Sequence, residues 1–123
     1  LARFNVPTPA TLAVVGKGMT KLDPQIAAAA KAAKRKLLDS DAANAYVKRQ
    51  DGWALLQHDV PTVMVTSAYG DIARMETYFD TDYHRPTDTA RPTLELGGAA
   101  EDVEFLVFLG QWFGDVKRVP VGK

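Results

Sequence analysis

The chain has 123 residues, no cysteine, and 15 basic residues against 15 acidic ones. The balanced charge leaves no overall field to attract nucleic acid or an anionic membrane, and the missing thiols exclude disulfides, thiol catalysis and thiolate metal sites. The apolar share is 46%, and no apolar run approaches the ~20 residues of a membrane span. These totals predict one globular domain of ordinary composition.

The first part of the chain predicts one strand followed by one helix. The run Thr11–Val15 is short and apolar and is closed by Gly16, as is typical of a strand buried on both faces. Asp23 and Pro24 are start signals for a helix over residues 24–38, in which apolar residues recur at spacings of four, three and four. We therefore expect a strand–helix unit within a parallel sheet.

The middle of the chain predicts a second buried strand that leads to a loop. Asp51 begins a short helix, and Thr62–Thr66 follows as a strand because β-branched residues flank Met64. A short helix over residues 72–78 then leads into an aromatic loop over residues 78–89. In open α/β sheets, ligands gather beyond the carboxyl ends of strands. We therefore expect functional groups in this loop.

A long helix is expected over residues 94–114, and its sequence is apolar nearly all round. One face would cover the sheet, and a second face carries Phe105, Phe108 and Trp112. A helix of this kind is either buried or covered by another chain. Together the segments predict an α/β fold with a partial, mostly parallel sheet flanked by helices.

Two motifs carry a resemblance to a known family. One is the loop motif Asp82-Tyr83-His84-Arg85-Pro86-Thr87-Asp88-Thr89. The other leads into the second strand and reads His58-Asp59-Val60-Pro61-Thr62-Val63-Met64. They are similar to the D-Y-H-x-P-x-D-T signature and the x-G-I-P-A-x-x strand entry of the zinc aminopeptidases of metallopeptidase family 28. The chain resembles the C-terminal half of such an enzyme over nearly its whole length. This implies a single domain over residues 1–123, the C-terminal fragment of a zinc-exopeptidase (phosphorylase/hydrolase-like) catalytic domain.

The resemblance implies a peptidase that removes N-terminal residues from peptide substrates with a water activated by two zinc ions. It implies that His84 binds one zinc through a neutral imidazole nitrogen, because the signature histidine is the last ligand of that site. It also implies that the Tyr83 hydroxyl points at the oxyanion of the tetrahedral intermediate. Asp88 is expected to fix the loop or to orient His84, and Asp80 and Asp82 are further candidates for that role.

The chain departs from the family pattern in two places. Family members commonly have Ser-Asp-His at the head of the short helix, where this chain has Gln50-Asp51-Gly52, and this difference affects the expected substrate pocket. The other zinc ligands and the glutamate base come from H-x-D and E-E stretches, which residues 1–50 do not contain. Catalytic zinc sites use about three protein ligands. We therefore expect the chain alone to be inactive and not to bind zinc tightly.

Two classes of function stay open at this point. The chain is either a piece of a zinc exopeptidase or a non-catalytic interaction or dimerisation domain derived from the same fold. A truncated fold would leave apolar surface uncovered, so we expect self-association through an exposed patch around Phe105, Phe108 and Trp112. The sequence leaves the compartment open, and the resemblance suggests a secreted or periplasmic protein.

Overall fold

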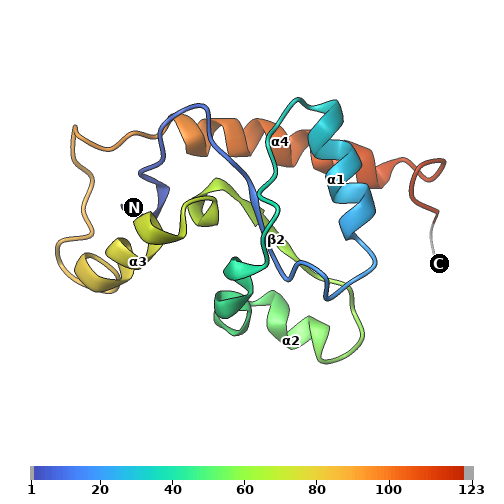
Figure 1. The fold of residues 1–123 in the computed structure, drawn as a ribbon, viewed down its shortest axis with the longest axis horizontal. Coiled ribbons are helices and arrows are strands. Elements are labelled where there is room, and N and C mark those ends of the chain that lie inside the picture. Colours follow the sequence, from blue (N-terminus) through green and yellow to red (C-terminus); the bar gives the residue numbers. More distant parts are fainter. Residues whose placement is uncertain (1, 121–123) are drawn as a thin grey trace.

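The computed structural model describes residues 2–120 and places a short pair of strands between helical segments (Figure 1). Its α-helices are α1 (Asp23–Ala32), α2 (Gly52–Leu56), α3 (Ile72–Thr81) and α4 (Gly97–Gly114). Its strands are β1 (Ala13–Val15) and β2 (Met64–Thr66). Short 3-10 helices are η1 (Ala2–Phe4), η2 (Ala42–Arg49) and η3 (Ser67–Tyr69).

The two strands pair antiparallel, with Val14 opposite Val65 at the centre of the ladder. The expectation of an α/β fold with a partial, mostly parallel sheet flanked by helices, as in a zinc exopeptidase, is therefore wrong: within residues 2–120 the regular structure is mostly helical, with this antiparallel pair as its sheet. Within residues 2–120, parallel pairing is confined to a single bridge between Leu12 and Leu37. Burial on both faces suggested parallel strands, but burial depends on what covers a sheet and not on strand direction. The connection over residues 16–63 is long enough to return in either direction.

Alternate residues of β1, together with Leu12 just before it, enter two separate cores. Ala13 and Val15 pack into a cluster with residues of η2, η3 and α3. Leu12 and Val14 pack into a second cluster, with residues of α1, β2 and α4. Successive side chains of a strand point to opposite faces, so helical segments cover both sides of the pair. This arrangement explains the continuous apolar run in the sequence.

Helix α1 ends at Ala32, six residues before the end expected from the sequence. The backbone turns at Lys34, whose φ of 55° lies in the left-handed region. The chain then runs extended beside β1: Leu12 N–H donates to Lys36 O (2.9 Å), and Leu38 N–H donates to Leu12 O (2.7 Å). The expected last turns of the helix are therefore an extended segment, whose backbone groups gain partners on the strand.

Helix α4 buries a different face from the one expected. Phe105 is only 2% exposed, and Phe108 and Trp112 are half-buried. The Trp112 indole N–H also donates to a glutamine side chain of α1 (2.8 Å). The predicted exposed patch around these three aromatic residues is therefore wrong, because α1 and the β1–β2 pair take up the aromatic side of the helix. Aliphatic residues of α4 such as Val103 and Val107 are exposed instead.

A buried carboxylate links α4 to the end of β2. One oxygen of Asp102 accepts hydrogen bonds from Ser67 N–H (2.7 Å), Ser67 Oγ (2.8 Å) and Thr66 Oγ1 (3.2 Å). The Arg35 guanidinium donates to its other oxygen at 3.1 Å. Buried charges require this kind of compensation by partners. The network therefore fixes α4 against the turn that follows β2.

Candidate functional site

The loop of the expected site begins at the end of α3, a helix with a clear start signal. Asp71 caps the helix by accepting a hydrogen bond from Arg74 N–H (3.1 Å). The helix runs on to Thr81, three residues beyond the expected end. The chain then folds back, because Tyr83 N–H donates to Tyr78 O at 2.9 Å. The start of the site motif is therefore held against the last turn of α3.

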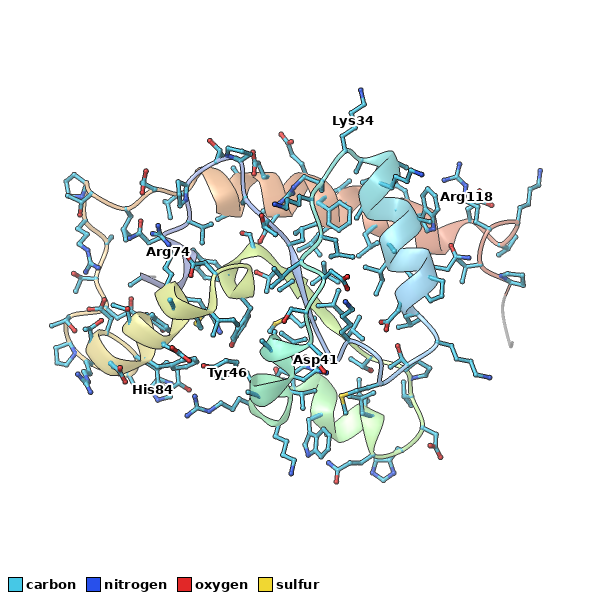
Figure 2. The ribbon with its side chains drawn as sticks, in the orientation of Figure 1. Lys34, Asp41, Tyr46, Arg74, His84 and Arg118 are labelled. Atoms are coloured by element: carbon cyan, nitrogen blue, oxygen red, sulfur yellow. The ribbon has the colours of Figure 1, made fainter. Side chains whose placement is uncertain are left out.

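His84 occupies an unusual backbone position at the exposed end of this turn. Its φ is 54°, in the left-handed region, where L-residues other than glycine are uncommon. Its imidazole stacks on the Tyr83 ring with centroids 3.9 Å apart and planes at 19°. Within residues 2–120, the imidazole makes no hydrogen bond and no ion pair. Figure 2 places His84 at one side of the molecule, near the end of α3. Both ring nitrogens are therefore available to a ligand.

An aromatic cluster fixes the position of Tyr83. Its ring meets Phe79 edge-on, with centroids 4.8 Å apart, and meets Tyr78 at 5.7 Å. Phe79 in turn stacks on Tyr46 of η2, with centroids 5.2 Å apart. Such edge-on and offset pairs are favourable beyond the area that they bury. The cluster therefore joins η2, α3 and the loop, and it provides the support for the Tyr83–His84 stack.

Arg49 lies over the same cluster and was not found from the sequence. Its guanidinium carbon lies 4.7 Å from the ring centroid of Phe79 and 5.7 Å from that of Tyr83. Both distances are within the range of cation–π contacts. Within residues 2–120, this exposed guanidinium has no carboxylate or hydrogen-bond partner. Arg49 comes from η2, more than thirty positions before the motif, so no local sequence pattern predicts the contact.

The two aspartates of the motif contact other parts of the loop and its neighbours. Asp82 lies 3.4 Å from the Arg91 guanidinium. Asp88 accepts hydrogen bonds from Ala2 N–H (2.7 Å) and Tyr78 Oη (3.2 Å). Burial, and then the charge of Asp88, raise the pKa of the Tyr78 phenol. These contacts correspond to a loop-fixing role and tie the loop to η1 and α3. Asp80 is exposed on α3.

The described residues provide a possible zinc ligand but not a zinc site. Within residues 2–120, no three His, Cys, Asp or Glu side chains come together as a group that could hold a metal ion. His84 fits one ligand position, since its imidazole is exposed and both nitrogens are available. His58, the other histidine, is exposed in the turn after α2. Any complete ligand set would need groups from outside these residues.

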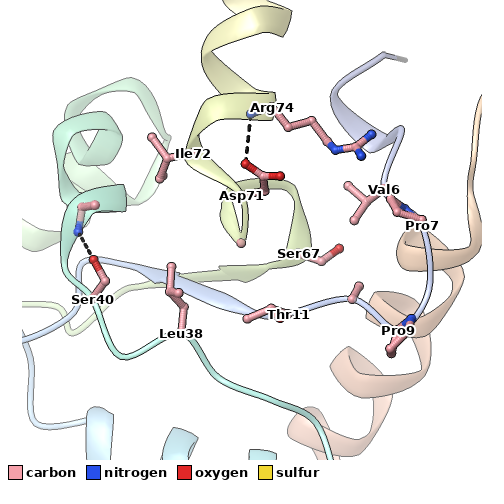
Figure 3. A pocket seen from close by; sticks show the side chains of 13 residues that line it. Val6, Pro7, Pro9, Thr11, Leu38, Ser40, Ser67, Asp71, Ile72 and Arg74 are labelled. Atoms are coloured by element: carbon pink, nitrogen blue, oxygen red, sulfur yellow. Dashed lines mark hydrogen bonds between the residues drawn. The ribbon is translucent and has the colours of Figure 1, made fainter.

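A cavity of about 510 Å³ lies between the segment before β1, the segment after α1 and the start of α3 (Figure 3). Its polar side chains include Asp71, which caps α3, and Arg74, which donates to Asn5 O at 2.9 Å. Their hydrogen bonds therefore serve the local structure. None of the expected site residues lines this cavity, so the exposed Tyr83–His84 stack is the better candidate for chemistry.

No protein-family model, curated protein or solved structure matches the chain. The likeness to family 28 therefore depends on the motifs alone, and the single domain over residues 1–123 stays a prediction with it. Among residues 2–120, no helix is both long and apolar enough to cross a membrane.

Proposed function

We propose that the chain is part of a metal-dependent aminopeptidase that hydrolyses N-terminal peptide bonds. The observation that carries this proposal is the Tyr83–His84 stack. It places a phenol hydroxyl and an imidazole side by side, with ring centroids 3.9 Å apart. Neither polar group has a hydrogen-bond partner within residues 2–120. A zinc ligand next to a hydrogen-bond donor suits the hydrolysis of a peptide carbonyl.

Each residue of the cluster has a separate part in the proposal. His84 holds zinc through a neutral imidazole nitrogen, and its stacking on Tyr83 restricts the orientation of the ring. Tyr83 donates its hydroxyl proton in a hydrogen bond to the substrate oxygen that gains negative charge. Arg49 offers unpaired N–H donors beside Tyr83 for a carbonyl or carboxylate of the substrate. Zinc in such a site supplies Lewis-acid polarisation of the carbonyl and activation of a water.

The proposed activity belongs to a longer protein. Catalytic zinc sites use about three protein ligands, and residues 2–120 contribute His84 alone. We therefore expect the isolated chain to be inactive and to bind zinc weakly. The remaining ligands and the general base would come from residues before this chain.

The test uses the longer protein, purified with its metal and assayed on aminoacyl amides. We expect bound zinc measured by elemental analysis, and a loss of both zinc and at least a hundredfold in kcat/KM for His84→Ala. Tyr83→Phe should keep the zinc and lose about 10²–10³ in kcat, the range for one oxyanion donor. His58→Ala is the matched control and should keep both. The proposal would be refuted if the longer protein bound no zinc, or if its His84→Ala variant stayed fully active.

A second candidate is a non-catalytic interaction or dimerisation domain. The observation that favours it is the exposed apolar side of α4, where Val103 is 62% exposed and Val107 is 60% exposed. Under this alternative the longer protein binds no zinc and cleaves no aminoacyl amide, and His84→Ala changes neither result. The metal and activity measurements therefore separate the two candidates.

A further inference from the structure

Arg49 presents a guanidinium at the Tyr83–His84 stack while its hydrogen-bond donors stay free. Its central carbon lies 4.7 Å from the ring centroid of Phe79 and 5.7 Å from that of Tyr83. A guanidinium over a ring uses its face for this contact, whereas its five N–H donors lie in its own plane. Within residues 2–120 none of these donors has a hydrogen-bond or ion-pair partner. The two rings therefore support the side chain without using its donors.

Acidic side chains lie nearby without pairing with this guanidinium. The pKa of the Tyr46 phenol is raised first by burial and then by the charge of Glu76, with a smaller contribution from Asp80. Arg49 acts on the same phenol and lowers its pKa. All three charges thus lie around the Tyr46 ring, yet in the described part of the chain neither carboxylate forms an ion pair with Arg49. An incoming anion would therefore find these donors without a partner to displace.

The ligand that best suits the free donors is a carboxylate. Two parallel N–H groups of a guanidinium match the two oxygens of a carboxylate, and such charge-assisted hydrogen bonds are roughly twice as strong as neutral ones. A peptide carbonyl offers one oxygen and no charge, so it gains less from the same donors. The unpaired Arg49 therefore favours a substrate that carries a negative charge near the reacting bond.

The spacing within the cluster indicates which part of the substrate carries this charge. The proposed function sets the reacting carbonyl oxygen at the Tyr83 hydroxyl. Arg49 lies 5.7 Å from the centroid of the same ring. Successive residues of a peptide are ~3.8 Å apart, and the N–H donors extend toward the ligand by a further hydrogen bond. A group on the residue directly after the scissile bond matches this spacing best.

We propose that Arg49 binds a carboxylate of the residue directly after the scissile bond, and that the enzyme prefers substrates that carry one there. Two kinds of substrate supply this group. A dipeptide supplies its C-terminal carboxylate, and a longer peptide with aspartate in the second position supplies a side chain. This inference rests on the proposed function, because that function places the substrate beside Tyr83.

The first test compares three substrates of the longer protein, purified with its metal: Leu-Gly, its amide Leu-Gly-NH2, and Leu-Asp-NH2. We expect kcat/KM for Leu-Gly, for Leu-Asp-NH2 or for both to exceed that for Leu-Gly-NH2 by about 10–100-fold, the range for hydrogen bonds to a charged group. Which of the two is preferred identifies the source of the carboxylate. Arg49→Met should remove the preference, and Arg49→Lys, which keeps the charge without the paired donors, should retain only part of it.

Lys48→Met is the matched control for the loss of one positive charge. Lys48 is the neighbour of Arg49 on η2, but its ammonium lies over Trp53, 5.4 Å from the ring centroid, and not over the aromatic cluster of Tyr83. This variant should keep the full preference for the carboxylate substrates. An equal loss in Lys48→Met and Arg49→Met would mean that the general field of η2 acts on the substrate, and it would overturn the assignment to Arg49.

A second test needs no catalysis. Reduced forms of Leu-Gly and Leu-Gly-NH2, in which a methylene group replaces the scissile carbonyl, cannot be hydrolysed, and calorimetry on the longer protein measures their Kd. The acid form should bind at least about tenfold more tightly than the amide form. Arg49→Met should lose this difference and Lys48→Met should keep it.

The outcomes separate this inference from the proposed function. Cleavage of aminoacyl amides with equal kcat/KM for the three substrates would overturn the inference and leave the proposed function standing. A longer protein without zinc or cleavage would refute the proposed function, and the substrate preference would fall with it. Tighter binding of the acid form that depends on Arg49 would then still support a carboxylate site. Equal affinities of the two reduced forms would overturn that site as well, as expected if a carboxylate elsewhere in the longer protein pairs with Arg49.

Discussion

Replacing Asp102 by alanine should remove a large part of the stability of this fold. Its carboxylate is the common acceptor for the end of β2, the following turn and Arg35. The side chains of Asp102 and Arg35 are only 11% and 13% exposed. Without the carboxylate, the guanidinium keeps its hydrogen bond to Glu101 O (2.8 Å) but has lost its closest charged partner. The buried N–H of Ser67 loses its acceptor as well.

The magnitude follows from these two losses. Breaking a buried ion pair by removing one partner costs about 3–5 kcal/mol, and an orphaned buried donor costs about 1–3 kcal/mol. The terms overlap in one network, so we expect Asp102→Ala to lower the free energy of unfolding by about 3–5 kcal/mol. Ser67→Ala removes one hydroxyl donor and should cost about 1 kcal/mol. Asp102→Asn keeps the shape without the charge and should fall between them.

Urea unfolding followed by circular dichroism and tryptophan fluorescence measures these differences. Domains of this kind are stable by about 5–15 kcal/mol, so Asp102→Ala lies near the limit of folding. The losses expected for Asp102→Asn and Ser67→Ala are smaller, so these variants should stay folded and the predicted ranking of the three can be measured. The variant Arg35→Met/Asp102→Leu should recover part of the loss, since apolar replacement of both partners is often tolerated. The reasoning would be refuted if Asp102→Ala cost less than about 1 kcal/mol. It would also be refuted if the cost of Arg35→Met/Asp102→Leu equalled the sum of the costs of its two single substitutions.

Three further changes test other parts of the structure. Gly70→Ala should cost at least about 2 kcal/mol in urea unfolding, because its Cβ would overlap the backbone carbonyl of Thr11. Gly110 lies in open space, so Gly110→Ala should instead stabilise the fold by about 0.5–1 kcal/mol. Equal effects of the two substitutions would contradict the close packing of Gly70 against Thr11. Burial and a neighbouring carboxylate raise the pKa of the Tyr78 phenol above its ordinary value of 10.0, so the folded state holds that proton more tightly than the unfolded state. Unfolding free energy should therefore fall as pH rises above about 10, and fall less in Tyr78→Phe. The His84→Gly variant should be more stable to unfolding than the His84→Ala variant by about 1 kcal/mol, because the backbone φ at this position is 54°. Identical stabilities would mean that this backbone position carries no strain.

The candidate site could be predicted only where its residues are close in the sequence. Tyr83 and His84 are neighbours in the loop motif, so the motif itself brought them together, and their catalytic roles stay predictions. The contact of Arg49 with Tyr83 joins η2 to a loop more than thirty residues later. The ion pair of Arg35 with Asp102 spans a still longer separation. No local spacing encodes either contact.

The sequence by itself determined where apolar segments and breaks occur, because periodicity and capping residues act within one or two turns. The buried strands around Val14 and Val65, a helix that starts near residue 72 and the long final helix were predicted in this way. Only the tertiary structure decided the antiparallel direction of the strands, the early end of α1 and the side of α4 that is buried. Phe105 and Val103 are both apolar, and the shape of the surface that each meets places one inside and leaves the other exposed. Periodicity shows which residues share a side of a helix, whereas burial depends on partners that are distant in the chain.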